Sequence, residues 1–150
     1  MGEKCNLNAS VGWFMDSGAS DHMTNQRTWF DSYTKFKTKT RVKIGNGDLI
    51  MALGKGSINI LAFDGNKWNE KTLLNVLYVP DININLFSSG RAVDKGLQMI
   101  SDQNSCKFIK DGRIVAVGER KRRLYEMKFK MCRKADDFEA NVVKLETTQT

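Results

Sequence analysis

One stretch of the chain determines how the rest is interpreted: WFMDSGAS, residues Trp13 to Ser20. Three apolar side chains lead directly into Asp16, and Ser17 and Gly18 follow it. This order predicts a strand that fixes the position of Asp16 and removes water from one side of its carboxylate. Gly18 permits a tight turn after the strand, and backbone amides in that turn can donate to the carboxylate. Ser17 adds a hydroxyl that can reach a second subunit.

A single carboxylate in such a turn cannot hydrolyse a peptide by acid–base chemistry, but two facing carboxylates can. Like charges about 3 Å apart do not both ionise, so the two groups share one proton. One group then acts as the base toward water, and the other donates to the carbonyl oxygen. The chain has no second Asp-Ser-Gly or Asp-Thr-Gly, and 150 residues are too few for two such lobes. A two-fold homodimer is therefore expected to bring two copies of Asp16 together.

The remaining pattern is typical of an all-β protein with one short helix. Arg41–Ile44 alternates with a period of two, and Asn46-Gly47 predicts a hairpin that returns along 49–53. A short helix is expected from Ser88 to Lys95, with a serine cap at its start and Gly96 after its end. Further strands are expected at 55–61, 72–79, 97–100, 107–109, 113–117 and 124–129.

Composition excludes several classes of protein. The 41% hydrophobic and 27% charged residues are typical of a soluble globular chain rather than collagen or a disulfide scaffold. No apolar run approaches the ~18 residues of a membrane span, so no membrane partner is expected. The three cysteines lie far apart in sequence, which favours reduced thiols, and the single His22 cannot complete a zinc site. No metal or cofactor is therefore predicted.

The net charge of +7 raises the question of a nucleic-acid partner. Basic residues cluster at Glu119–Arg123 and at every second position from Lys35 to Lys43. Alternation in the second cluster favours a solvated strand face. Aromatic residues in 29–43 match a base-stacking surface only loosely, so nucleic acid is a weak prediction.

Polar ends flank the patterned region. We expect 1–10 to be a flexible N-terminal segment, 11–129 to be the folded domain, and 130–150 to be a linker. Within the linker, Ala135 to Leu145 has the spacing of a weak amphipathic helix whose apolar side carries Phe138.

Three motifs, in order, resemble the protease region of copia-type LTR-retrotransposon Gag-Pol polyproteins, which are retropepsin-like aspartic proteases. They are WFMDSGASDHMT (Trp13 to Thr24), LNVLYVP (Leu74 to Pro80) and NLFSS (Asn85 to Ser89). The resemblance extends over residues 11–127. It implies a closed retropepsin-like β-barrel with one short helix, acting as a homodimer in the cytoplasm within a virus-like particle. It also implies that a pre-integrase region follows the linker.

The resemblance assigns roles to the loop after the first strand. Asp16 would be the catalytic aspartate, one from each subunit, and Ser17 would make interlocking contacts beneath the pair. Gly18 would hold the substrate backbone through its carbonyl, and Ala19 would complete the loop. His22 is expected to form local hydrogen bonds rather than to act as a catalytic base.

The hairpin Ile44, Gly45, Asn46, Gly47 and Asp48 would be the flap that closes over a peptide. The implied activity is that of an aspartic endopeptidase that processes the Gag-Pol polyprotein, with a polyprotein peptide as substrate and no cofactor. Related enzymes pair a helix arginine with an acid in the active-site loop. Here Ser20 occupies the position of that acid, so no such ion pair is predicted for Arg91.

A second hypothesis stays open at this point. The chain can be a catalytically inactive protease-fold module that acts in dimerisation or RNA association, which the +7 charge motivates. The intact Asp16-Ser17-Gly18 favours the enzyme.

Overall fold

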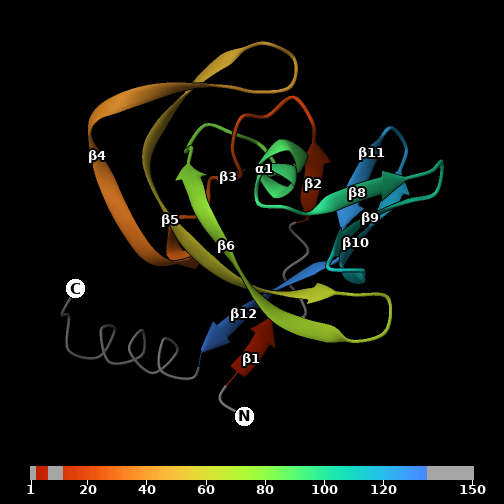
Figure 1. The fold of residues 1–150 in the computed structure, drawn as a ribbon. Coiled ribbons are helices and arrows are strands. Elements are labelled where there is room, and N and C mark those ends of the chain that lie inside the picture. The colour runs from red at the N-terminus through yellow and green to blue at the C-terminus, as the bar shows by residue number, and fades with distance from the viewer. Residues whose placement is uncertain (1–2, 7–11, 135–150) are drawn as a thin grey trace.

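Alternating apolar and polar residues form strands over most of the chain, and one short helix, α1 (Ser89–Asp94), follows the seventh strand (Figure 1). The computed structural model describes residues 3–6 and 12–134. Within these residues, the prediction of a mostly β fold with one short helix is confirmed. The strands are β1 (Glu3–Asn6), β2 (Trp13–Asp16), β3 (Met23–Thr24), β4 (Phe30–Lys43), β5 (Leu49–Phe63), β6 (Trp68–Tyr78), β7 (Asn85–Ser88), β8 (Gln98–Ser101), β9 (Ser105–Lys110), β10 (Arg113–Lys121), β11 (Leu124–Met127) and β12 (Phe129–Lys134).

The strands form one sheet in the order β1-β12-β5-β6-β3-β7-β2-β11-β10-β9-β8, with β4 paired to β5 beside this path. In the part of the chain described, the end strands β1 and β8 do not pair with each other. The predicted closure of the barrel is therefore not seen in the sheet. The reason lies in the antiparallel series β11-β10-β9-β8, in which each strand joins the outer edge of the previous one. This series extends the sheet outward instead of returning it to β1.

Strand β5 joins two parts of the sheet. Along one side it pairs first with β4 and then, near its end, with β12, while β6 pairs along the other side. The prediction of two strands, 49–53 and 55–61, is wrong because Gly54, which separates them, lies with Gly56 in one continuous strand. A Cβ atom on Gly56 would overlap the backbone carbonyl of Ser32 on β4. These glycines therefore permit close packing of β4 rather than a turn.

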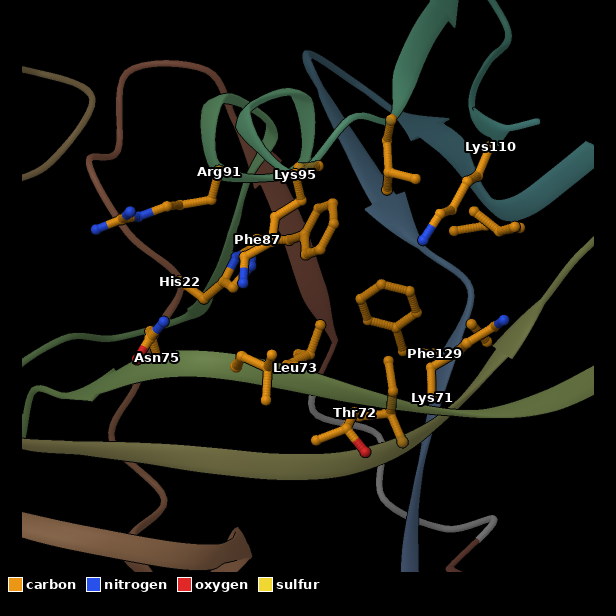
Figure 2. A pocket seen from close by; sticks show the side chains of 17 residues that line it. His22, Lys71, Thr72, Leu73, Asn75, Phe87, Arg91, Lys95, Lys110 and Phe129 are labelled. Carbon is orange, nitrogen blue, oxygen red and sulfur yellow. The ribbon is translucent and has the colours of Figure 1, made fainter. Parts of the chain in front are cut away.

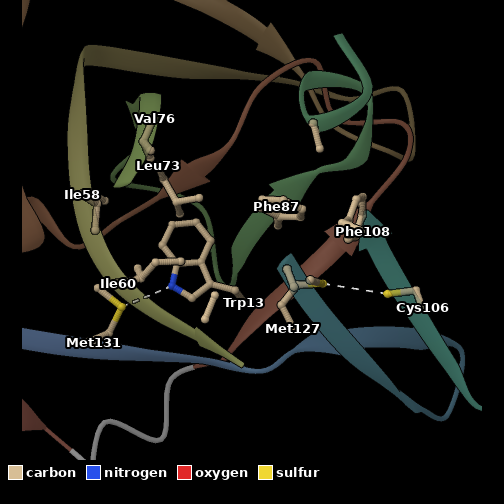
Figure 3. Close-up of a cluster of buried hydrophobic side chains, with 13 residues drawn as sticks. Trp13, Ile58, Ile60, Leu73, Val76, Phe87, Cys106, Phe108, Met127 and Met131 are labelled. Atoms are coloured by element: carbon tan, nitrogen blue, oxygen red, sulfur yellow. Dashed lines mark hydrogen bonds between the residues drawn. The ribbon is translucent and has the colours of Figure 1, made fainter. Parts of the chain in front are cut away.

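Two apolar clusters fill the space between the strands. In the larger one, Trp13 is 1% exposed and donates its Nε1–H to Met131 Sδ at 3.4 Å (Figure 3). Phe87 and Phe108 pack edge to face beside it, with ring centroids 5.3 Å apart. The smaller cluster contains Ala19 and lies under the β4–β5 hairpin. Since Trp13 and Ala19 belong to different clusters, β2 and the loop after it bridge the two cores.

Strands also lie in the two end segments, for which the sequence predicted a flexible end and a linker. β1 pairs with β12, and β12 pairs with β5 through Phe129 and Ala62. Both pairings join residues far apart in the chain, from Phe129 opposite Ala62 to Glu3 opposite Lys134, so no local pattern signals them. They place Cys5 opposite Cys132 in register, although the sequence separates the two widely. The helix expected at 135–145 lies outside the described residues.

Two glycine substitutions test the packing of β4 on β5. Gly56→Ala should lower the free energy of unfolding by about 3 kcal/mol, because the added methyl group meets rigid backbone. Gly90→Ala in α1 is the matched control, because a Cβ atom there would be in ordinary contact with Ser88 Oγ at 3.7 Å. It should raise stability by about 0.5 kcal/mol. Urea unfolding of both variants measures the difference, and equal midpoints would contradict the packing described.

Candidate functional site

Asp16 is held at the end of strand β2, in which Trp13 is buried and the other residues are half-buried. β2 runs parallel to β7 from Trp13 opposite Asn85 to Asp16 opposite Ser88. The chain then turns, and the Gly18 amide donates to Asp16 Oδ1 at 2.8 Å. The carboxylate therefore has a fixed position and an amide donor, as the sequence predicted. Asp16 itself is half-buried.

The β4–β5 hairpin lies directly on Asp16. Its turn is closed by the Gly47 amide, which donates to the Ile44 carbonyl at 2.9 Å, and by the Ile44 amide, which donates to the Asp48 carbonyl at 3.0 Å. A Cβ atom on Gly45 would lie 2.6 and 2.7 Å from the two carboxylate oxygens of Asp16. Only a residue without a side chain fits this position.

The same contact explains the glycine after Asp16. A Cβ on Gly18 would lie 2.8 Å from Gly45 Cα, so two glycine backbones meet here without side chains between them. The structure thus brings the predicted flap residues and the predicted active-site loop together in one chain. With the hairpin in this position, Gly45 covers the Asp16 carboxylate.

The loop is tied to α1 by an ion pair that the sequence analysis did not predict. Arg91 Nε donates to Asp21 Oδ1 at 2.7 Å, and Arg91 Nη2 also contacts this oxygen. The expectation that Arg91 makes no ion pair with this loop is therefore wrong, because Asp21, one position after Ser20, supplies the acid. Asp21 and Arg91 are far apart in the sequence, and they pair only because α1 lies against the loop.

Ser88 holds the loop from the other side. Its Oγ donates to the Ala19 carbonyl at 2.9 Å and accepts from the Arg91 amide at 3.2 Å, which makes it the N-cap of α1, as predicted. Its amide donates to His22 Nδ1 at 2.9 Å. The Ser88 hydroxyl therefore links the helix to the loop.

His22 is a structural residue of this network. It is 7% exposed and stacks on Phe87, with ring centroids 4.7 Å apart and an interplanar angle of 9°. Burial lowers the pKa of His22 from 6.5 to about 4, against a smaller opposing effect of Asp21. A neutral ring whose Nδ1 accepts a backbone hydrogen bond agrees with the local role expected for His22.

Other features bear on what the site can do. Ser17 is exposed at the tip of the turn, where a second chain can reach it. Within residues 3–6 and 12–134, no three His, Cys, Asp or Glu side chains gather as a metal-binding group. None of the helices described there is long and apolar enough to cross a membrane.

Comparison with known proteins identifies related sequences. A family model described as "Pol polyprotein, beta-barrel domain" matches residues 13–97. The chain is also similar to a transposon Ty5-1 protein of Saccharomyces cerevisiae, with 36% identity over 79 residues. The aligned part covers 53% of this chain and 48% of the relative, so the chain spans about half the length of that curated relative. No solved structure matches.

The burial of His22 predicts a pH dependence of stability. Because the pKa is about 4 in the folded chain and 6.5 when unperturbed, the unfolded chain binds the extra proton between these values. Stability is therefore complete above pH 6.5 and falls as the pH drops toward 4. Between pH 7 and 5 the loss should be about 2 kcal/mol.

His22→Asn is the variant that isolates this effect, since an amide oxygen can still accept from the Ser88 amide but does not titrate. Urea unfolding at pH 7 and pH 5 should show a much smaller loss for the variant. The pKa values of Asp64, Asp102 and Glu119 are lowered, so these groups titrate below the range used. An equal loss in both proteins would assign the dependence to other groups.

Proposed function

This chain belongs to the family of Pol polyprotein beta-barrel domains, and from that premise we propose that it is one subunit of a homodimeric aspartic endopeptidase. Its similarity to a transposon protein makes it a domain of a retrotransposon Pol polyprotein. The proposed substrate is an extended peptide of that polyprotein. The observation that best supports the proposal is the position of Asp16 at the end of β2. Its carboxylate accepts a hydrogen bond from the Gly18 amide and lies against Gly45 of the hairpin.

The proposed chemistry needs a second Asp16, supplied by a second copy of the chain. The two carboxylates share one proton, so one of them takes a proton from water while the other donates to the carbonyl oxygen of the substrate. The water oxygen bonds to the carbonyl carbon. When the tetrahedral intermediate collapses, the carbon–nitrogen bond breaks and the departing amine takes the proton that the first carboxylate removed from water. The other carboxylate takes back a proton from a hydroxyl of the intermediate, so the pair again holds one proton. Ser17, exposed beside Asp16, is the residue that would contact the partner subunit.

The hairpin position gives the proposal a conformational requirement. Gly45 packs on Asp16 in the single chain, so a peptide can enter only when the hairpin withdraws. A substrate would then lie as an added strand between the hairpin and the Gly18 loop. In this proposal the isolated chain is closed, and its active form is a dimer with a raised hairpin.

Replacement of the carboxylate tests the proposed chemistry. Asp16→Asn should reduce cleavage of the polyprotein precursor by at least about a thousandfold, because neither subunit can then act as the base. The circular dichroism spectrum and the unfolding midpoint should be unchanged. Asp111→Asn is the matched control, because Asp111 lies in a turn with φ of 52° that asparagine also adopts. Undiminished cleavage by Asp16→Asn would refute the mechanism.

The same assay separates the enzyme from the inactive module. If the wild-type chain forms dimers but does not cleave the precursor at any concentration, and instead binds RNA with a strong salt dependence, the binding module is the better description.

Two single serine-to-alanine variants, one at the proposed dimer contact and one as a control, test that contact. Ser17→Ala should raise the dissociation constant of the dimer about tenfold, because a hydroxyl contact is lost from each subunit. Ser20→Ala is the control, since Ser20 is also exposed and its backbone amide donates to the Lys43 carbonyl at 3.5 Å. Sedimentation equilibrium measures both constants. Equal constants for the two variants would remove Ser17 from the interface.

A further inference from the structure

A cavity of about 270 Å³ lies away from Asp16, between α1 and strands β5, β6 and β10 (Figure 2). Leu73, Phe87, Val115 and Phe129 supply much of its apolar interior, and His22 forms part of one wall. Engineered apolar cavities of about 150 Å³ already accept benzene. This cavity therefore has room for a phenyl ring, and the proposed peptidase chemistry does not use it.

Cations surround the mouth of the cavity. Lys71 on β6, Lys95 at the end of α1 and Lys110 at the end of β9 all line it and are exposed. Among the described residues, none of these three lysines takes part in an ion pair, whereas Arg91 at the same rim is paired with Asp21. An apolar interior beneath unpaired cations suits a ligand that presents an aromatic group beside carboxylates.

The chain itself contains such a sequence. Residues 136–139 read Asp-Asp-Phe-Glu, so three carboxylates flank one phenylalanine, in a chain whose net charge is +7. We propose that the segment Ala135–Leu145 docks in this cavity of its own chain, with Phe138 inserted into the apolar interior. Asp136, Asp137 and Glu139 would then face the lysines at the mouth.

The place where the described chain ends makes this docking possible. Phe129 at the start of β12 lines the cavity, and Met131 pairs with Ile60, another lining residue. Lys134 is three residues beyond Met131, or about 10 Å along a strand. Phe138 is four residues beyond Lys134, and an extended chain of that length spans about 14 Å. The segment can therefore turn back to the end of the cavity nearest Lys71.

Photocrosslinking in the full chain tests the docking directly. With p-benzoylphenylalanine in place of Phe138, irradiation should give crosslinks within one chain to cavity residues such as Leu73 or Val115. The same group in place of Thr148, beyond the docked segment, is the position control and should give at most scattered products. Mass spectrometry identifies the linked residues, and a denaturing gel separates products of one chain from those of two.

Charge reversal supplies the second measurement. Lys71→Glu combined with Lys110→Glu should reduce the crosslink yield from position 138 about fivefold, because exposed ion pairs each contribute modestly. Both side chains are exposed, so the fold should survive, which circular dichroism verifies. Crosslinks to a second copy, crosslinks outside the cavity, or a yield unaffected by charge reversal would each overturn the docking. Because the inference does not rest on peptidase activity, it can fail or hold independently of the Asp16→Asn result.

Discussion

The parallel pairing of β2 with β7 is the constraint on which the rest of the structure depends. It joins segments about seventy residues apart and sets Asp16 opposite Ser88. From that register follow the serine cap of α1, the hydrogen bond from Ser88 to the Ala19 carbonyl and the stacking of His22 on Phe87. A slip of one residue would turn every side chain of β2 to the opposite face. The carboxylate would then leave the loop that holds it.

Close approach of backbones is a second theme of the molecule. At Gly18 and Gly45 two backbone segments of the same chain meet with no side chain between them, which lets the hairpin contact Asp16. At Gly54 and Gly56 the absence of a side chain likewise lets β4 lie close to β5. The first contact lies at the candidate site, whereas the second is enclosed within the continuous β4–β5 ladder. Glycine therefore permits close contact between backbone segments both at the candidate site and within the sheet.

Sequence patterns predicted the features whose causes are local. The strand into Asp16, the Asn46-Gly47 hairpin and the cap of α1 each follow from neighbouring residues, and the structure contains all three. The continuity of β5, the β1–β12 pair and the Asp21–Arg91 ion pair depend on distant partners, so short-range patterns did not reveal them. The sequence predicts a break at Gly54 because its close neighbour, Tyr33, is supplied by another strand. Sequence patterns did not reveal the cavity either, because its lining residues come from α1 and several separate strands.

The length of β5 has a mechanical consequence. Its first residues carry the hairpin over Asp16, and its last residues hold β12. One continuous strand thus runs from the hairpin above the carboxylate to the pairing with β12. A change in the pairing register of β5 would therefore alter the contact above Asp16 and the pairing with β12 together.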